Sequence, residues 1–338
     1  MYKIALITGD GIGPELSESV ISVLDTVNNK LGVKIEVTKL EAGDAALKKT
    51  GKALPDATLD TIKKSDACLK APVGERAADV IVVLRRLLDL YANIRPAKSY
   101  PNMPALKENI DMVIVRENTE DLYTGMEFDV GDTAIALRSI SKSASERIAR
   151  HAFETAVRRD KKRKVTCVHK SNVMRKTDGL FAKTCEGIAK SYPQIAFEHM
   201  YVDACAMNLI RQPEAFDVIV TTNLFGDILS DEASQVVGGL GMAPAANIGD
   251  KFALFEPVHG AAFDIAGKNI ANPSSFILSA KMMFEWLGTK NNDKSCHDAA
   301  RKIEDAVYGI VKEGIKTKDI GGDKSTREFT QNVISRIT

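Results

Sequence analysis

The feature of this sequence that most constrains its fold is the alternation of apolar runs of strand length with segments of helical periodicity. The run at 3–8 (KIALIT) leads into a helical pattern that begins at Pro14. Further strand-length runs lie at 33–40, 66–73, 111–118, 164–170, 197–204 and 216–223. This alternation is typical of an α/β protein, in which helices pack against a sheet.

The first predicted helix has clear start and stop signals. Pro14 lies in its first turn and Gly32 follows its last residue. Its apolar face consists of Leu16, Val20, Val23, Leu24, Val27 and Leu31. The spacing of these residues predicts an amphipathic helix that packs on the sheet.

Composition excludes several classes of function. The 338 residues, 44% of them hydrophobic, suffice for a large core in one domain or two. With 46 basic and 45 acidic residues, no global field favours nucleic acid or a membrane surface. The basic stretch at 158–164 (RRDKKRK) is expected to be a solvated helix end. We see no export signal and no run near the roughly 20 apolar residues that span a bilayer, so a soluble, cytoplasmic protein is expected.

The cysteines give little functional signal. Cys68, Cys167, Cys185, Cys205 and Cys296 are scattered and include no C-x-x-C pair. Their spacing predicts neither a zinc site nor a disulfide framework, and it suits a reducing compartment. All five are expected to be small buried hydrophobic side chains.

Three glycines, Gly9, Gly11 and Gly13, stand between the first strand and the first helix. Glycines at such a junction let a backbone approach a ligand closely. Their spacing is not the G-x-G-x-x-G of a Rossmann phosphate loop, and a tight turn explains them equally well. The sequence therefore does not predict a Rossmann fold.

Arginines form the first group of residues that could carry chemistry. They stand at the ends of predicted apolar elements, and the last is followed by Tyr123; they are Arg85, Arg86, Arg95 and Arg116. Guanidinium groups bind carboxylates bidentately, so several converging arginines would suit a small polyacid. Arg86 is expected to be an ordinary surface residue.

Two further segments carry suggestive polar residues. Asp227 and Asp231 are four residues apart in a predicted helix, where two carboxylates on one face could hold a hard divalent cation. The loop-like run at 255–275 contains His259, Asp264 and Asn272, which are groups of the kind that read a nucleotide's sugar and base.

Seven motifs, taken together, resemble the isocitrate/isopropylmalate dehydrogenase family. They are GDGIGPE at 9–15, LDLYANIRPAK at 88–98, VRENTEDLY at 115–123, HKSNVMRKTDGLF at 169–181, YVDACAMNL at 201–209, GDILSDEAS at 226–234 and EPVHGAAFDIAGKNIANP at 256–273. The resemblance covers essentially the whole chain, and seven ordered motifs are highly specific. Within the family, the sequence looks most like the archaeal type of 3-isopropylmalate dehydrogenase.

The resemblance implies a non-Rossmann α/β fold with two domains and a cleft between them. A large cofactor-binding domain would combine 1–96 with 239–338, and a small inserted domain, 97–238, would carry the dimer interface. Family members are homodimers in which each active site takes a lysine and an aspartate from the partner subunit. Lys170 and Asp203 match those two residues, so a monomer is expected to be inactive.

The resemblance also implies roles for single residues. The arginines that bind the substrate's carboxylates match Arg85, Arg95 and Arg116. The Mg²⁺ or Mn²⁺ ligands match Asp203, Asp227 and Asp231. Lys170 and Tyr123 match a proton-transfer pair: the lysine accepts the 2-hydroxyl proton as hydride passes to the nicotinamide, and the tyrosine reprotonates the enolate left by decarboxylation.

The expected cofactor is NAD. Positions of the family's cofactor site match Glu256, His259, Gly260, Ala261, Asp264 and Asn272. NADP-dependent isocitrate enzymes of the family often carry a lysine where this chain has Asp264. A carboxylate there can accept hydrogen bonds from both ribose hydroxyls and repels a 2′-phosphate.

Ile81 and Val82, one helical turn before Arg85, stand where the family reads the substituent that distinguishes its substrates. Two branched aliphatic side chains suit an isopropyl group, so the expected reaction converts 3-isopropylmalate to 4-methyl-2-oxopentanoate, in leucine biosynthesis. Homoisocitrate, isocitrate and D-malate stay open as alternatives, because one methylene changes preference by only ~1–3 kcal/mol. An alternative of another class is a non-catalytic regulatory subunit, although none of the catalytic set is missing.

Overall fold

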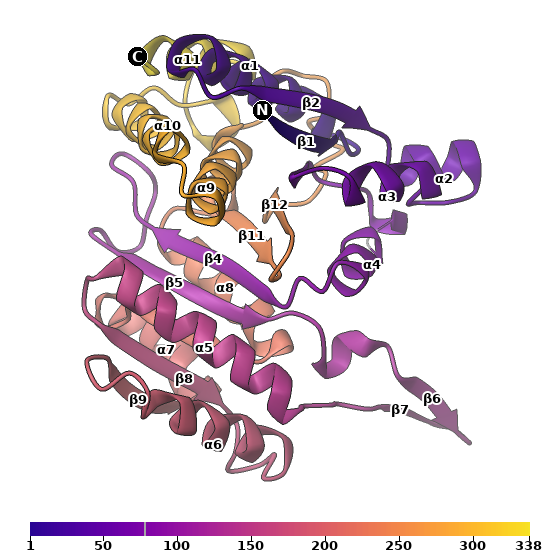
Figure 1. Ribbon diagram of the computed structural model, residues 1–338, viewed down its shortest axis with the longest axis vertical. Helices are drawn as coiled ribbons and strands as arrows, with labels where there is room; N and C mark the ends of the chain where they lie inside the picture. Colours follow the sequence, from indigo (N-terminus) through magenta and orange to yellow (C-terminus); the bar gives the residue numbers. More distant parts are fainter. Residues whose placement is uncertain (78) are drawn as a thin grey trace.

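The computed structural model describes residues 1–77 and 79–338, and its helices and strands alternate as predicted (Figure 1). Ten of the described strands form one mixed sheet in the order β2-β1-β3-β12-β11-β4-β5-β10-β8-β9. These strands are β1 (Tyr2–Ile7), β2 (Ile35–Leu40), β3 (Ala67–Lys70), β4 (Ala92–Lys98), β5 (Asp111–Glu117), β8 (Lys164–His169), β9 (Ala196–Tyr201), β10 (Val218–Thr221), β11 (Pro244–Ile248) and β12 (Ala253–Pro257).

Helices cover both faces of this sheet (Figure 1). The α-helices are α1 (Gly13–Leu31), α2 (Asp44–Thr50), α3 (Asp56–Lys63), α4 (Asp79–Leu87), α5 (Lys142–Arg159), α6 (Thr177–Ala189), α7 (Val202–Arg211), α8 (Asn223–Val236), α9 (Ser274–Asn291), α10 (Lys294–Lys312) and α11 (Thr326–Arg336). Side chains alternate along β5, so Val113 and Val115 pack with α5 and α6, whereas Met112 and Ile114 pack with α7 and α8.

The prediction for the first helix is confirmed. Five residues of its apolar face are fully buried and the sixth, Leu31, is partly buried against the same cluster. Gly32 adopts a left-handed conformation with φ of 70°, which ends α1. The spacing of the apolar residues therefore predicted both the helix and the face that it buries.

One predicted strand is wrong at its end, and some strands were not predicted. The run at 197–204 is a strand only to Tyr201, because Val202 begins α7, which buries Cys205 and Leu209 at helical spacing. Strands β4, β11 and β12 lay outside the predicted runs. The paired strands β6 (Glu127–Val130) and β7 (Thr133–Ala136) were also missed, and they extend away from the main sheet (Figure 1).

The expected division into two domains stays a prediction. The strands and helices at one end of the sheet, β5, β10, β8, β9 and α5–α8, all come from 97–238. The lower boundary falls inside β4, which pairs with β5 over seven residue pairs from Ala92 to Lys98. The sheet is therefore continuous across the proposed boundary.

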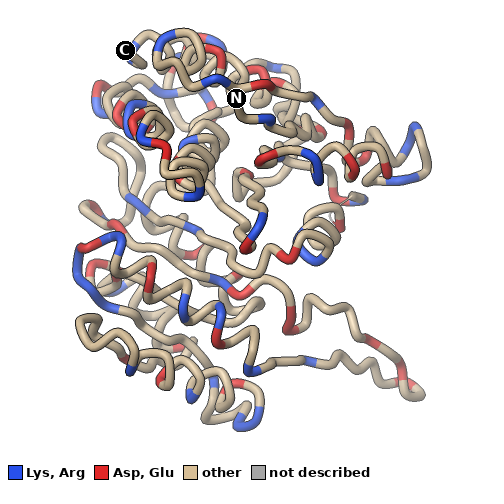
Figure 2. The backbone as a smooth tube through the Cα atoms, viewed as in Figure 1, with Lys and Arg blue, Asp and Glu red and all other residues tan. Residues whose placement is uncertain are grey.

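Acidic and basic residues are interspersed along the backbone (Figure 2). The basic stretch at 158–164 is mostly exposed at the end of α5, as expected. Arg159 is partly buried, and it bonds to Asp217 at 2.9 Å and to Asp111 at 3.0 Å. Asp217 is fully buried, so this arginine anchors the end of α5 to the sheet. Among the described residues, no helix is both long and apolar enough to cross a membrane.

Candidate active site

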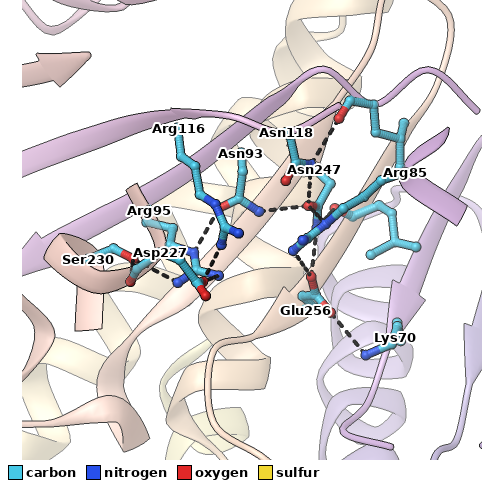
Figure 3. A network of polar contacts seen from close by, with 12 residues as sticks. Lys70, Arg85, Asn93, Arg95, Arg116, Asn118, Asp227, Ser230, Asn247 and Glu256 are labelled. Atoms are coloured by element: carbon cyan, nitrogen blue, oxygen red, sulfur yellow. Dashed lines mark hydrogen bonds and ion pairs between the residues drawn. The ribbon is translucent and has the colours of Figure 1, made fainter. Parts of the chain in front are cut away.

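Three of the four arginines converge. Arg85 on α4, Arg95 on β4 and Arg116 on β5 have buried side chains that lie in one network of polar contacts (Figure 3). Arg86, by contrast, is exposed, as expected. Charged groups this deeply buried need partners, and apart from Asn93 on β4 the partners lie on α8, β11 and β12.

The pairing of β4 with β5 positions two of these arginines. Asn93 lies opposite Arg116 in the antiparallel register, and Arg95 lies two residues further on the same face as Asn93. The Nε of Arg95 donates to Asn93 Oδ1 at 2.7 Å. Helix α8 approaches closely at Gly226, where a Cβ would lie 2.5 Å from the Cγ of Arg116. Glycine is therefore required where α8 crosses this arginine.

Asp227 lies at the centre of the charged cluster. It forms an ion pair with Arg116, lies 3.3 Å from Nη2 of Arg95, and accepts the hydroxyl of Tyr123 at 2.5 Å. Burial opposes ionisation of this carboxyl, but the guanidinium groups of Arg116 and Arg95 hold its pKa below the usual value. Burial, followed by repulsion from Arg95 and Arg85, lowers the pKa of Arg116 to about 9.

Asp231 lies one helical turn after Asp227 and is more exposed. Arg95 Nη1 reaches its Oδ1 at 3.2 Å and the Ser230 hydroxyl at 2.7 Å. Burial, opposed by Arg95 and reinforced by Asp227, raises the pKa of Asp231. Two carboxylates on one helical face, with part of each open to solvent, form a hard oxygen donor set that suits Mg²⁺ or Mn²⁺.

Lys170 and Asp203 form a second pair of charged candidates. Lys170 follows β8 and Asp203 is in the first turn of α7, and the two side chains form an ion pair. Hydrogen bonding to Lys170 lowers the pKa of Asp203. In the described part of the chain, no hydrogen bond or ion pair joins either residue to Tyr123, Asp227 or Asp231. The expectation that Lys170 and Asp203 act in the partner's active site stays a prediction.

Asn247, on β11, is a functional residue that the sequence reasoning missed. Its Oδ1 accepts from Arg85 at 2.9 Å, from Asn93 at 2.6 Å and from Asn118 at 3.0 Å. Its Nδ2 donates to Glu256 at 2.8 Å. A buried asparagine inside the apolar run at 244–248 was the available signal, since a buried amide needs several partners.

Glu256, which is expected at the cofactor site, contacts the arginine network. Its carboxylate lies 3.0 Å from Lys70 Nζ and 3.4 Å from Arg85 Nη2, with all three side chains buried (Figure 3). Burial opposes its ionisation, but Lys70 and Arg85 lower its pKa to about 2. Glu256 therefore offsets the positive charge that Arg85 brings into the interior.

We expect Glu256→Gln to lower the free energy of unfolding at pH 7 by about 3–5 kcal/mol, because it leaves Lys70 and Arg85 without a buried counter-charge. Since the folded-state pKa is depressed, the carboxylate's contribution is fully present above about pH 4.3 and is lost as pH falls towards 2. Urea unfolding of the wild-type protein and of Glu256→Gln between pH 7 and pH 3 measures the difference in their free energies of unfolding. Glu18→Gln, which removes an exposed ion pair, is the control. A difference that does not shrink with falling pH would contradict this account.

The loop between β12 and α9 carries the other candidate cofactor residues. His259 is partly buried, and its Nε2 has no hydrogen-bond partner within the described residues. Asn272 is buried and donates to Gly241 O at 3.2 Å, whereas Asp264 is exposed. Gly260 is also exposed, while Ala261 is buried. A buried imidazole nitrogen without a partner suits a ligand that carries hydrogen-bonding groups.

The glycines at the first strand-to-helix junction serve a tight turn against other backbone. A Cβ on Gly9 would lie 2.0 Å from Pro72 O, and one on Gly11 would lie 2.0 Å from Ala261 O. Both residues have positive φ, which glycine adopts without strain. The Ile12 amide donates to Ala261 O at 2.8 Å, so this turn holds the candidate cofactor loop in place.

Ile81 and Val82 lie on α4, the helix that also carries Arg85. Both are partly buried, and Ile81 packs against the cluster beneath α3 and α4. The helix therefore places two branched aliphatic side chains about one turn from the first substrate-binding candidate.

Arg138 is a further residue that the sequence reasoning did not single out. Its guanidinium donates to Asp121 at 2.6 Å and to Thr222 at 2.8 Å, and it also bonds to Asp178, whose carboxylate is fully buried. Asp178 in turn accepts the backbone N–H of Lys170 at 2.6 Å. One arginine thus ties together the segments that carry Tyr123, Lys170 and the start of α8.

Comparisons with known proteins show which family and fold this chain resembles. The model of the family described as Isocitrate/isopropylmalate dehydrogenase matches residues 3–333. The 3-isopropylmalate dehydrogenase of Sulfurisphaera tokodaii is 52% identical over 338 residues, covering 99% of both chains. The homoisocitrate dehydrogenase of Methanocaldococcus jannaschii is 46% identical over 354 residues, covering 100% of this chain and 98% of that protein. The crystal structure of isocitrate dehydrogenase from Methylococcus capsulatus has a TM-score of 0.91 and 43% identity, covering 100% of this chain and 99% of that one.

Proposed function

The chain belongs to the isocitrate/isopropylmalate dehydrogenase family and is an oxidatively decarboxylating dehydrogenase, and we propose that it converts 3-isopropylmalate and NAD to 4-methyl-2-oxopentanoate, CO₂ and NADH in leucine biosynthesis. The observation that carries this proposal is the convergence of three buried arginines beside two carboxylates on α8. Such a site suits a small hydroxy acid with more than one carboxylate.

Arg85, Arg95 and Arg116 bind the substrate's carboxylates in this proposal. Burial lowers the pKa of Arg85 and Arg116, and repulsion from Arg95 adds to this effect in both. An anionic substrate would relieve that repulsion and would use guanidinium forks that the surrounding asparagines already orient. Binding energy is thus concentrated on the malate core, which is common to the family's substrates.

Asp227 and Asp231 would hold the divalent cation, together with the partner's Asp203. Their partly exposed oxygens on one face of α8 fit a hard cation, and added positive charge would relieve the repulsion between the two carboxylates. A bound Mg²⁺ or Mn²⁺ polarises the oxygen on C2 as a Lewis acid. Arg95 contacts both carboxylates and keeps them on the substrate's side of the helix.

Proton transfer falls to Tyr123 and to the partner's Lys170. Tyr123 donates to Asp227 and stacks against Arg116, whose guanidinium carbon lies 4.9 Å from the ring centroid. Its hydroxyl is therefore held at the edge of the carboxylate site, where it could return a proton to the decarboxylated product. Lys170, which pairs with Asp203 in each chain, would accept the 2-hydroxyl proton in its neutral form.

A homodimer follows from this division of residues. Exposed apolar side chains lie on the elements that would meet the partner: Met207 (65% exposed) and Ile210 on α7, Ile228 on α8, and Phe128 and Val130 on β6. Uncovered apolar residues on neighbouring helices and on a projecting hairpin are typical of a subunit interface. The same helix, α7, carries Asp203 at its start.

Substrate choice is tested by measuring NADH formation with Mg²⁺ and NAD on 3-isopropylmalate, homoisocitrate, isocitrate and D-malate. We expect kcat/KM for 3-isopropylmalate to exceed the others by roughly 10- to 200-fold, because Ile81 and Val82 offer an isopropyl group apolar contact and offer a further carboxylate no partner. A tricarboxylate that wins would overturn the pocket assignment. No turnover on any of the four would favour the regulatory subunit.

For the cofactor, Asp264→Lys is expected to raise the ratio of NADP to NAD kcat/KM at least about tenfold, because a lysine attracts the 2′-phosphate that a carboxylate repels. The chemistry that NAD would supply is acceptance of a hydride from C2 of the substrate, and Asp264→Lys should alter only cofactor choice. Asp305→Lys, the same charge change at an exposed position on α10, is the matched control. An unchanged ratio in Asp264→Lys would show that this residue does not contact the ribose.

A further inference from the structure

The edge of the main sheet brings together a cysteine and two histidines that the proposed reaction does not use. Cys167 and His169 stand two residues apart on β8, so their side chains leave the same face of the sheet. His199 stands directly opposite Cys167 on the neighbouring parallel strand β9. His199 is thus at least 30 positions away in the sequence from Cys167 and His169, but all three side chains lie next to one another on one face of the sheet.

The ligand atoms of this cluster are close enough to share one ion. One ligand atom from each of the three residues lies within 4.8 Å of the other two. The Nε2 of His169 lies 3.2 Å from the Nδ1 of His199. Two imidazole nitrogens bound to one tetrahedral Zn²⁺ are about 3.3 Å apart, given Zn–N bonds of about 2.0 Å. The histidine pair therefore already has the separation that a shared metal requires.

We propose that Cys167, His169 and His199 form a site for a divalent transition metal of the Zn²⁺ type. Thiolate and imidazole ligands select such ions over Mg²⁺, whereas the carboxylates of Asp227 and Asp231 prefer Mg²⁺ or Mn²⁺. The two sites thus differ in the ions that they bind. This proposal does not depend on the dehydrogenase's substrate.

Access to the site comes through a cavity of about 670 Å³ beside α6. Both histidines line this cavity, together with Lys183, Glu186 and Tyr201. His199 is exposed, whereas Cys167 is fully buried, so an entering ion meets the histidines before it reaches the thiol. Glu186 lines the same cavity as the two histidines, so its carboxylate or a water could serve as the fourth ligand.

Metal binding at this cluster is coupled to proton transfer. Burial, with repulsion from His199, lowers the pKa of His169, which favours the neutral imidazole that binds metals. The Ser171 N–H donates to His169 Nδ1 at 3.3 Å, so this hydrogen bond must break when Nε2 binds the ion and the ring proton moves to Nδ1. Burial, followed by a hydrogen bond with Cys185, raises the pKa of Cys167, so the metal must displace its thiol proton: one proton leaves for each metal bound.

Such an ion would fasten an edge strand beside a catalytic candidate. β9 pairs only with β8 in the main sheet, and His169 immediately precedes Lys170. A metal bridging β8 and β9 would fix the segment from which Lys170 projects. Binding to the folded state alone would also raise the unfolding temperature with metal concentration.

The test is a Co²⁺ titration of the metal-free full-length protein with Mg²⁺ present in excess to occupy the carboxylate site. We expect one equivalent of Co²⁺ per chain to produce a thiolate-to-cobalt charge-transfer band, which oxygen ligands cannot give. Cys167→Ser should abolish this band. Cys296→Ser, which alters a buried cysteine on α10 outside the cluster, should retain it.

His199→Gln keeps the test decisive even if Cys167→Ser does not fold, because His199 is exposed. It should weaken Zn²⁺ binding, measured by competition with a chelating dye, by more than the roughly 10- to 100-fold typical of losing an outer-shell partner. Absence of the band in the wild-type protein, its persistence in Cys167→Ser, or unchanged Zn²⁺ affinity in His199→Gln would each overturn the proposal.

Discussion

Replacing Lys170 with methionine is expected to lower kcat about 10²- to 10⁴-fold, the usual contribution of a positioned proton acceptor. Methionine is close in length to lysine but cannot accept a proton, so the variant should lose activity mainly through a lower kcat, with KM little changed. Steady-state rates at saturating substrate measure it. Lys190→Met, at an exposed position after α6, is the control and should retain activity.

A mixed dimer distinguishes a shared active site from one built within a single chain. Asp227→Asn should also be inactive, because it removes the partner of Arg116 and a proposed metal ligand. If each site takes Lys170 from the other subunit, a dimer of one Lys170→Met chain and one Asp227→Asn chain contains one intact site. Random pairing of equal amounts should therefore restore about one quarter of the wild-type activity.

Failure of the mixture to recover activity would place Lys170 and Asp227 in the same chain's site. Size-exclusion chromatography of two differently tagged variants, co-expressed and purified through both tags, shows whether the mixed dimer has formed. Among the described residues, Lys170 pairs with Asp203 and has no hydrogen bond or ion pair to Asp227, which is the structural reason to expect recovery.

The second large effect is expected from Arg85→Gln, which should lower kcat/KM by roughly 30- to 5,000-fold. Truncating one partner of a buried charge pair costs about 2–5 kcal/mol, and each 1.36 kcal/mol is tenfold in rate. In the free protein the Arg85 side chain is already held by Asn247 and Glu256, so the substrate meets an oriented guanidinium. The effect should appear largely as a higher KM.

Arg86→Gln provides a closely matched control. The two arginines are adjacent on α4, but Arg85 is buried and Arg86 is exposed. We expect Arg86→Gln to change kcat/KM no more than about twofold, since exposed ion pairs contribute little. Equal losses in the two variants would indicate a general effect on α4 and would remove the substrate-binding role of Arg85.

Much of the fold could be predicted because its elements have internal periodicity. The apolar face of α1 repeats at the helical period, and β5 alternates between two hydrophobic clusters. Strand β4 was missed because the stretch YANIRPAK contains proline and buried polar residues, and it is a strand through its pairing with β5 and β11. The β6–β7 hairpin was missed because its residues are mostly exposed and pack on no core.

The residues of the candidate site were likewise predicted only in part. Motif order identified the arginines, the aspartates and the tyrosine, since each lies in a segment specific to the family. Asn247 and Lys70 were missed, because what distinguishes a buried polar residue is its set of partners, and those partners lie on other strands. Glu256 was assigned from its motif to the cofactor, whereas its side chain contacts Lys70 and Arg85.

The sequence by itself determined the α/β class, the family and the residue types that the chemistry needs, because local periodicity and ordered motifs are properties of the chain alone. Only the tertiary structure decided which charges meet. Pairing of β4 with β5 sets Asn93 beside Arg116, and parallel pairing of β8 with β9 sets His199 beside Cys167. Such contacts depend on strand order and register, which arise when distant segments pack together.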